Sequence, residues 1–207
     1  MENSNNNEIW VFLSHSNKDY EKVFTSESGS FYIDELGIAQ RFEPATDNPF
    51  IDEETELIDK YHYETHQSIS SLIVPEGVKG FVGGFMRGVR VIDRVVLTDT
   101  LESIDENCFA NCILPSVVIP ASIQKIGIFA FGHTHIECLQ LPESLHSPYG
   151  RQFKDSYIGM LRMPKELKDD VALGRNNDLC INDQWLDNDK YGYLRWPSTY
   201  IENLEFY

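Results

Sequence analysis

The residues best suited to metal chemistry are histidines and cysteines in the middle of the chain. Cys108 and Cys112 precede His133, His135 and Cys138 by about one unit of the repeat described below. Thiolates and imidazoles are the usual ligands of a tetrahedral zinc ion. Structural zinc sites draw on closely spaced pairs such as C-x-x-C, which these residues lack. We therefore expect free, buried thiols and no bound metal.

Two further stretches invite a chemical interpretation but lack the order that their chemistry needs. The stretch NDLCINDQWLDNDK carries Asp178, Asp183, Asp187 and Asp189, without the alternating ligands, central glycine and late glutamate of an EF-hand calcium loop. The run GFVGGFMRG, residues 80–88, does not follow a strand as a phosphate-binding loop would. We expect its glycines to let the backbone turn and pack closely.

The N-terminal stretch IWVFLSHSNKDYEKV, residues 9–23, resembles the first sequence box of a TIR domain. Bacterial members of that family signal or cleave NAD. The second TIR loop, of Arg-Asp-Pro-Gly type, and the Trp-Cys-x-x-Glu helix that supplies the catalytic glutamate do not follow in this sequence. We expect residues 9–13 to form a strand and residues 14–23 a loop and short helix, with no catalytic residue and no cofactor.

The composition limits the classes of partner. The chain has 207 residues, of which 42% are apolar, and a formal net charge of −16. Residues 1–66 alone carry 4 basic and 15 acidic side chains. This charge repels phosphates and anionic lipids, so we expect no nucleic acid, and a basic protein partner fits best.

No apolar run reaches the ~20 residues of a membrane span. The cysteines, which include Cys180, are too few for a disulfide scaffold.

A repeat of about 22 residues organises the chain from residue 71 onward. Six segments align on a column that is proline in all but one: Pro75, Thr98, Pro120, Pro142, Pro164 and Pro197. The steps between them are 23, 22, 22, 22 and 33 residues. Apolar residues stand three positions before this column, at Leu72, Val95, Val117, Leu139, Leu161 and Leu194. Eleven positions after it the register gives Met86, Phe109, Phe131 and Phe153.

This pattern predicts a solenoid. Apolar residues one and three positions before the proline indicate a short strand with one face inward, and proline ends the strand because it has no N–H to donate. A unit of this size cannot bury its apolar face alone, whereas stacked units share one continuous core. The strands then form a parallel sheet.

The motifs within the repeats resemble the BspA-like class of leucine-rich repeat. Ile104, Phe109 and Cys112 match its return segment in one repeat, and Ile126–Gly127 and Ala130–Phe131 match it in the next. The resemblance covers residues 68–167, roughly half of the chain. It implies an α/β fold rich in β, namely a right-handed leucine-rich-repeat solenoid with a parallel β-sheet. It also implies a non-enzymatic protein-interaction module.

We expect two parts in the chain. Residues 1–66 form an acidic N-terminal cap segment that holds the TIR-box-like remnant. A helix that begins near Asp52, with Leu57, Ile58 and Tyr61 as its apolar face, covers the end of the core or docks a basic partner. Residues 67–207 form the solenoid, with a C-terminal cap from about residue 168. Six aromatic residues are expected to build this cap or an aromatic ligand cage: Trp185, Tyr191, Trp196, Tyr200, Phe206 and Tyr207.

One surface has a physical argument for binding. The residues two positions before the proline column alternate with the inward residues and should face solvent: Ile73, Val96, Val118, Gln140, Arg162 and Arg195. We call this row the strip. Its first three members are β-branched and apolar, and exposed apolar strips mark interaction sites. Packing and strand propensity alone also favour such residues.

The sequence leaves the partner unnamed. We expect an unidentified protein partner and a chain that is monomeric or weakly dimeric. As written, the N-terminus MENSNNNEIWVF lacks the pattern of a signal peptide and predicts a cytoplasmic protein; a leader removed beforehand would place it at the cell surface. The alternative functions are a TIR-related NAD-consuming or signalling protein and a structural or adhesive repeat protein of the cell envelope.

Overall fold

The structure is a computed structural model that describes residues 22–52, 67–145, 151–167, 179–181, 184–185 and 199–207. Helical content in these ranges is confined to two 3-10 helices, η2 (Arg151–Phe153) and η3 (Lys165–Leu167). The strands are β1 (Lys22–Ser26), β2 (Gly29–Ile33), β3 (Ile38–Pro44), β4 (Ile51–Asp52), β5 (Gln67–Ile73), β6 (Gly80–Phe81), β7 (Val89–Val96), β8 (Ser103–Ile104), β9 (Ile113–Val118), β10 (Lys125–Ile126), β11 (His135–Gln140), β12 (Ser156–Met163), β13 (Leu179–Ile181), β14 (Gln184–Trp185) and β15 (Thr199–Phe206).

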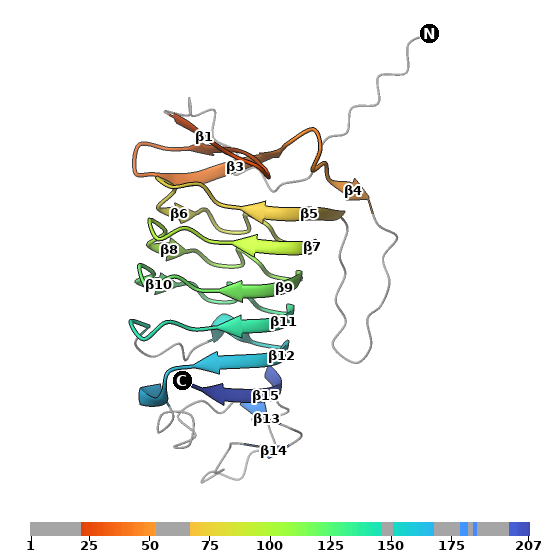
Figure 1. The fold of residues 1–207 in the computed structure, drawn as a ribbon, viewed down its shortest axis with the longest axis vertical. Coiled ribbons are helices and arrows are strands. Elements are labelled where there is room, and N and C mark those ends of the chain that lie inside the picture. The colour runs from red at the N-terminus through yellow and green to blue at the C-terminus, as the bar shows by residue number, and fades with distance from the viewer. Residues whose placement is uncertain (1–21, 53–66, 146–150, 168–178, 182–183, 186–198) are drawn as a thin grey trace.

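The described strands form two sheets: the larger runs along the stack from β4 to β14, and the smaller runs beside its first half, from β1 to β10 (Figure 1). The larger sheet has the order β14-β13-β15-β12-β11-β9-β7-β5-β4, and its strands from β5 to β15 are parallel neighbours. The smaller sheet has the order β1-β2-β3-β6-β8-β10. The repeats of β5, β7 and β9 each add one long strand to the larger sheet and one short strand to the smaller sheet, whereas β11 and β12 are followed by η2 and η3. The predicted β-rich solenoid with a parallel sheet is therefore confirmed.

The sequence pattern explains why each long strand forms where it does. In β11 and the residue after it, Ile136, Leu139 and Leu141 are buried and the residues between them are not. This spacing, I-x-x-L-x-L, sends three side chains into the core from each strand, and Pro142 then ends the strand. Strand β7 has one residue more than β5 between its paired residues, since the register shifts between the pairs Ile69–Val91 and Ser71–Arg94. That extra residue accounts for the single step of 23.

The core consists of columns of like residues. Phe131 stacks on Phe109 and on Phe153, with ring centroids 5.2 Å apart in both pairs. A second column consists of buried hydroxyl and thiol groups that each donate to a backbone carbonyl of the preceding repeat: Cys112 to Met86, Thr134 to Phe109, Ser156 to Phe131, and Thr199 to Phe153. Because carbonyls at the turns lie outside the strand ladders, these side chains supply the hydrogen bonds that buried backbone groups require.

Residues with a left-handed backbone recur at two positions of the return segments, the first in three of them and the second in four. The first is occupied by Gly84, Asn107 and Phe129, and the second by Gly88, Asn111, His133 and Asp155, all with φ between 54° and 75°. Glycine and asparagine adopt this conformation at low cost, whereas phenylalanine does not. The predicted turn at the glycine run is thus confirmed at Gly84 and Gly88, but the predicted close packing is not found at Gly84, where a Cβ would meet no atom within 4 Å. Phe129 carries backbone strain.

The N-terminal segment covers one end of the core. Strands β1, β2 and β3 form antiparallel pairs, and β3 also pairs in parallel with β6 of the first repeat. Phe31 of β2 is buried, and its ring stacks on Phe85 of that repeat at 6.1 Å. The predicted loop and short helix over residues 14–23 is wrong where it can be compared, because Lys22 and Val23 lie in β1. Residues 9–21 and the predicted helix after Asp52 lie outside the described residues.

The C-terminal end departs from the predicted register. The strand next to β12 is β15, which places Leu204 beside Leu161, and not Leu194 as the proline column indicated. Leu194 and Pro197 lie outside the described residues. β13, although earlier in the sequence, pairs with the far side of β15. The chain end therefore fills the place of the repeat that follows β12.

Candidate interaction face

The outward positions of β5, β7, β9, β11, β12 and β15 form one continuous surface, which we call the sheet face. They are the residues between the buried members of the I-x-x-L-x-L pattern. The strand registers align the second and third rows, and the first row consists of the residues that the pairing skips just before the second row. The first row is Ser70, Asp93, Pro115, Glu137, Gly159 and Glu202. The second row is Ser71, Arg94, Ser116, Cys138, Met160 and Asn203. The third row is Ile73, Val96, Val118, Gln140, Arg162 and Glu205.

The third row contains the predicted strip. Val96 and Val118 are 43% and 51% exposed, and the neighbouring Ile73 and Gln140 are half-buried. Arg162 is exposed at the other end of the row. The predicted last member, Arg195, lies outside the described residues. The residue beside Arg162 is Glu205, whose Oε2 lies 2.8 Å from Nε of Arg162, so the prediction of two adjacent arginines is wrong.

The first row was missed in the sequence because its residues share charge rather than hydrophobicity. Asp93, Glu137 and Glu202 are exposed carboxylates on β7, β11 and β15, with Pro115 and Gly159 on the strands between them. We call these three residues the carboxylate row. In the described part of the chain, Asp93 and Glu137 have no ion-pair partner, whereas Glu202 accepts a hydrogen bond from the Tyr157 hydroxyl. Their spacing across the sheet is a signal that the 22-residue register could have given.

Gly159 is the first-row residue on β12, and only a glycine fits at its position. A Cβ at this position would lie 2.8 Å from the carbonyl oxygen of Glu137, which is closer than a Cβ approaches backbone oxygen. Glycine therefore allows β12 to approach β11 here, and it leaves the space between Glu137 and Glu202 without a side chain.

An aromatic pair lies beside the carboxylate row. The rings of His135 and Tyr157 stack with centroids 4.6 Å apart on the neighbouring strands β11 and β12. Burial lowers the pKa of His135 below its usual value, and the nearby Glu137 raises it by a smaller amount. His135 is therefore neutral at pH 7 and adds no positive charge to the sheet face.

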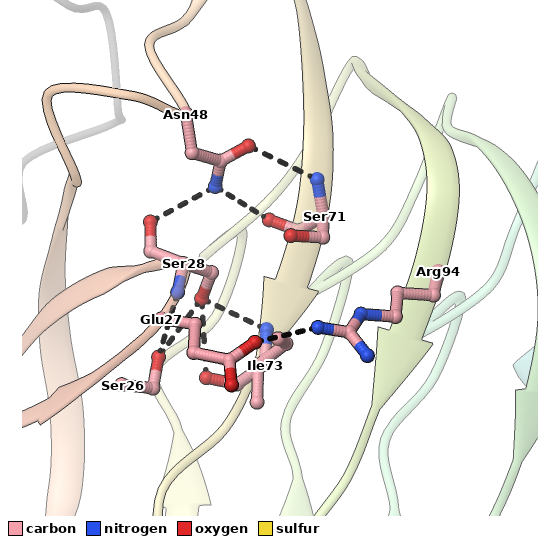
Figure 2. Close-up of polar contacts among 7 residues, drawn as sticks. All are labelled: Ser26, Glu27, Ser28, Asn48, Ser71, Ile73 and Arg94. Carbon is pink, nitrogen blue, oxygen red and sulfur yellow. Dashed lines mark hydrogen bonds and ion pairs between the residues drawn. The ribbon is translucent and has the colours of Figure 1, made fainter.

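Side chains close the N-terminal border of the sheet face (Figure 2). Ser28 Oγ accepts a hydrogen bond from the Ile73 N–H at 2.8 Å, and Asn48 Oδ1 accepts one from the Ser71 N–H at 3.1 Å. The amide of Asn48 also donates to the Ser71 carbonyl at 2.8 Å. With β4, which pairs with the first two residues of β5, these contacts satisfy the outer side of β5, to which the strand of a second copy would otherwise pair.

The cysteines and histidines considered for zinc have other contacts. Cys108 and Cys112 are buried, and the Cys112 thiol donates to the Met86 carbonyl at 3.0 Å. Burial raises the pKa of Cys112 to about 12 and that of Cys108 well above its usual value, so both stay protonated thiols. His133 lies 3.7 Å from an Asp155 carboxylate oxygen.

No cluster of metal-binding side chains occurs among the residues that the structure describes. Cys108, Cys112 and Cys138 are free; the first two are buried, as predicted, and Cys138 is half-buried. The side chain of Cys180 and the four aspartates of the calcium candidate lie outside the described residues. No helix in the described ranges has the length and apolar character needed to cross a bilayer.

Two of the six aromatic residues predicted to cap the C-terminal end can be placed. Phe206 packs on the core, and the hydroxyl of Tyr207 donates to the Leu141 carbonyl. Tyr191 and Trp196, with the side chains of Trp185 and Tyr200, lie outside the described residues. The two that are placed contact the repeat stack, as expected of a cap.

Comparison with known proteins adds one finding. A family profile described as the BspA type leucine rich repeat region matches residues 56–170, more than half of the chain, in 6 copies. No curated protein and no solved structure matches the chain.

Proposed function

The chain belongs to the family of BspA-type leucine-rich-repeat proteins, and on this basis we propose that it is a non-enzymatic protein-interaction module whose binding surface is the sheet face. A repeat region of this kind is an interaction or adhesion module, and the family is generally not enzymatic. A solenoid presents a long regular surface rather than a closed pocket, which suits the binding of a macromolecule.

The observation that carries the proposal is the exposure of Val96 and Val118. Two β-branched side chains stand on the neighbouring strands β7 and β9, each about half exposed, on a surface otherwise rich in polar residues. Burying such side chains at an interface stabilises a complex, since each removes apolar area from water. Arg162 and Glu205 continue the same row as a polar border.

A pull-down with the full chain tests the proposal. The double variant Val96→Glu plus Val118→Glu places two charges on the strip, and we expect it to lose partners that the unmodified protein captures. The matched control is Leu36→Glu plus Ile128→Glu, because both residues are exposed apolar side chains outside the sheet face, at 69% and 55%. Circular dichroism first establishes that all three proteins fold.

The two outcomes are distinct. Partners lost by the strip variant and kept by the control support the sheet face as the binding surface. Partners kept by both variants, or lost by both to the same extent, contradict it.

A further inference from the structure

We propose that the sheet face binds a basic amphipathic α-helix of a partner protein. The helix lies across the strands, with lysine or arginine residues seven apart facing the carboxylate row and apolar residues facing Val96 and Val118. This inference rests on the proposed function and adds the chemistry of the partner.

Charge is the first argument. The sheet face and its border carry five carboxylates, Glu27, Asp93, Glu137, Glu202 and Glu205, and three guanidinium groups, Arg90, Arg94 and Arg162. Arg94 pairs with Glu27 at 2.6 Å (Figure 2), and Arg162 pairs with Glu205 at 2.8 Å. The carboxylate row therefore keeps a negative field along one side of the face, which favours a cationic partner.

The spacing of the carboxylates is the second argument. Asp93, Glu137 and Glu202 stand on alternate strands of the sheet order β7-β9-β11-β12-β15. Neighbouring strands are ~4.8 Å apart, so the carboxylates recur about every 9.6 Å. An α-helix rises ~1.5 Å per residue, so residues seven apart are ~10.5 Å apart and share one face. Cationic residues at i, i+7 and i+14 thus meet all three carboxylates.

An extended peptide does not fit this spacing. At ~3.3 Å per residue, the same interval corresponds to three residues of a strand, and side chains three apart in a strand point to opposite sides. Only every second carboxylate would then meet a cation. The repeat distance therefore favours a helix over a strand.

The width of the surface agrees with a helix. The first and third rows are three residues apart along each strand, which corresponds to about 10 Å. This is close to the ~10 Å diameter of a helix with its side chains. Both rows face outward because the strand pairing skips the first-row residue, which interrupts the regular alternation of side chains there. The floor between them is the second row, in which the central residues Ser116, Cys138 and Met160 are uncharged. A helix resting there contacts carboxylates on one flank and valines on the other.

A second copy of this chain is a poor occupant. The protein carries a formal charge of −16, so two sheet faces would repel each other. The β5 edge is also closed by Ser28 and Asn48. A basic helix from a different protein meets neither obstacle.

The test uses the full chain and a fluorescein-labelled amphipathic peptide of about 18 residues, long enough to span ~27 Å as a helix. The peptide has lysines seven apart on one flank and leucines on the other. Fluorescence anisotropy measures its Kd at low and at moderate salt. One control peptide has glutamates in place of the lysines, and another carries a central proline that prevents a continuous helix.

Two protein variants test whether binding depends on the charge of the carboxylate row, with the fold left unchanged. Glu137→Gln plus Glu202→Gln removes two members of the carboxylate row. Glu143→Gln plus Glu106→Gln makes the same change at exposed glutamates off the sheet face. We expect the lysine peptide to bind with a Kd below about 100 μM and the first variant to weaken it about fivefold. The control variant and both control peptides should show no such dependence on the carboxylate row.

The outcomes distinguish this inference from the proposed function. If the pull-down shows that the strip binds partners, while the lysine peptide fails to bind or binds the Glu137→Gln, Glu202→Gln variant equally well, the inference is overturned and the proposed function stands. Equal binding of the proline-containing peptide also overturns the helical form. If the Val96→Glu, Val118→Glu variant captures the same partners as the unmodified protein and binds the lysine peptide with the same Kd, the proposed function and this inference are both wrong.

Discussion

The middle of the repeat stack and its C-terminal end have the same strand pattern but differ in how the chain supplies it. From Val117 through Leu139 to Leu161, each strand follows its neighbour by one 22-residue unit. The strand beside Leu161 is β15, whose Leu204 comes 43 residues later, about two units. The place at the edge of the stack therefore went to a segment with the right pattern, not to the next segment in sequence.

The free energies of loop closure and of side-chain burial explain why β15 lies beside β12. Doubling the length of a loop costs only about 0.6 kcal/mol of closure entropy. Burying a large aliphatic side chain stabilises the fold by about 1.5–3 kcal/mol, and Ile201 of β15 is fully buried. Thr199 adds the buried hydrogen bond to the Phe153 carbonyl. A distant strand that buries Ile201 and adds Thr199 to the column of buried hydroxyl groups thus outweighs the longer connection.

The largest effect is expected in the middle of the stack. Phe131→Ala removes a fully buried ring that stacks on rings in both neighbouring repeats, and should lower the free energy of unfolding by about 3–5 kcal/mol. Urea unfolding followed by circular dichroism measures this. Ile128→Ala, at a residue 55% exposed, is the control and should change stability by less than about 0.5 kcal/mol. A loss at Phe131 as small as at Ile128 would contradict the stacked column.

The next effect tests the C-terminal end. Ile201→Ala should cost about 2–4 kcal/mol, close to the cost of Ile158→Ala in the neighbouring strand, because the two residues are paired and buried in one column. In the register read from the proline column, Leu194 belongs to the repeat stack instead. A loss of stability in Leu194→Ala with none in Ile201→Ala would contradict the pairing of β15 with β12 and would favour the segment of Leu194 as the neighbouring strand.

A smaller effect compares the same column in both regions. Ser156→Ala and Thr199→Val each remove a buried hydroxyl and leave a backbone carbonyl, of Phe131 and of Phe153 respectively, without that donor. Each should cost about 1–2 kcal/mol. Similar values in thermal unfolding would show that β15 is held like a regular repeat. A cost confined to Ser156→Ala would show that the chain end contributes less than its geometry suggests.

The smallest effect has the opposite sign. Phe129→Asn replaces a residue with φ of 56° by the type found at the equivalent Asn107, and should raise stability by about 0.5–1 kcal/mol. The reverse change, Asn107→Phe, should lower it. Differential scanning calorimetry on both variants measures the shift in Tm. A loss of stability in Phe129→Asn would mean that contacts of the ring, which lies 5.9 Å from the Lys154 ammonium, outweigh the backbone strain.

Prediction from sequence succeeded where residue type decides the structure. The proline column ended β9 and β11, and the phenylalanine column stacked, because each depends on local geometry and on packing between identical units. It failed at Leu194 because proline was weighed above the spacing I-x-x-L-x-L. The segment IENLEF, residues 201–206, carries that spacing without a proline.

The site was partly predictable. Exposure of Val96 and Val118 followed from strand alternation alone. The carboxylate row did not, because Glu202 joins Glu137 only through the placement of β15. The closure of the β5 edge by Ser28 and Asn48 was also missed, since those residues lie in turns far from β5 in sequence.

The sequence by itself determined the repeat unit, its strands and the composition of its core, because alternation and a fixed 22-residue period act within and between neighbouring units. Only the tertiary structure decided what completes the ends. There Ser28, Asn48 and β15 compete with other segments for the same backbone groups and the same buried volume. That competition depends on long-range contacts, which a periodic pattern in one dimension does not encode.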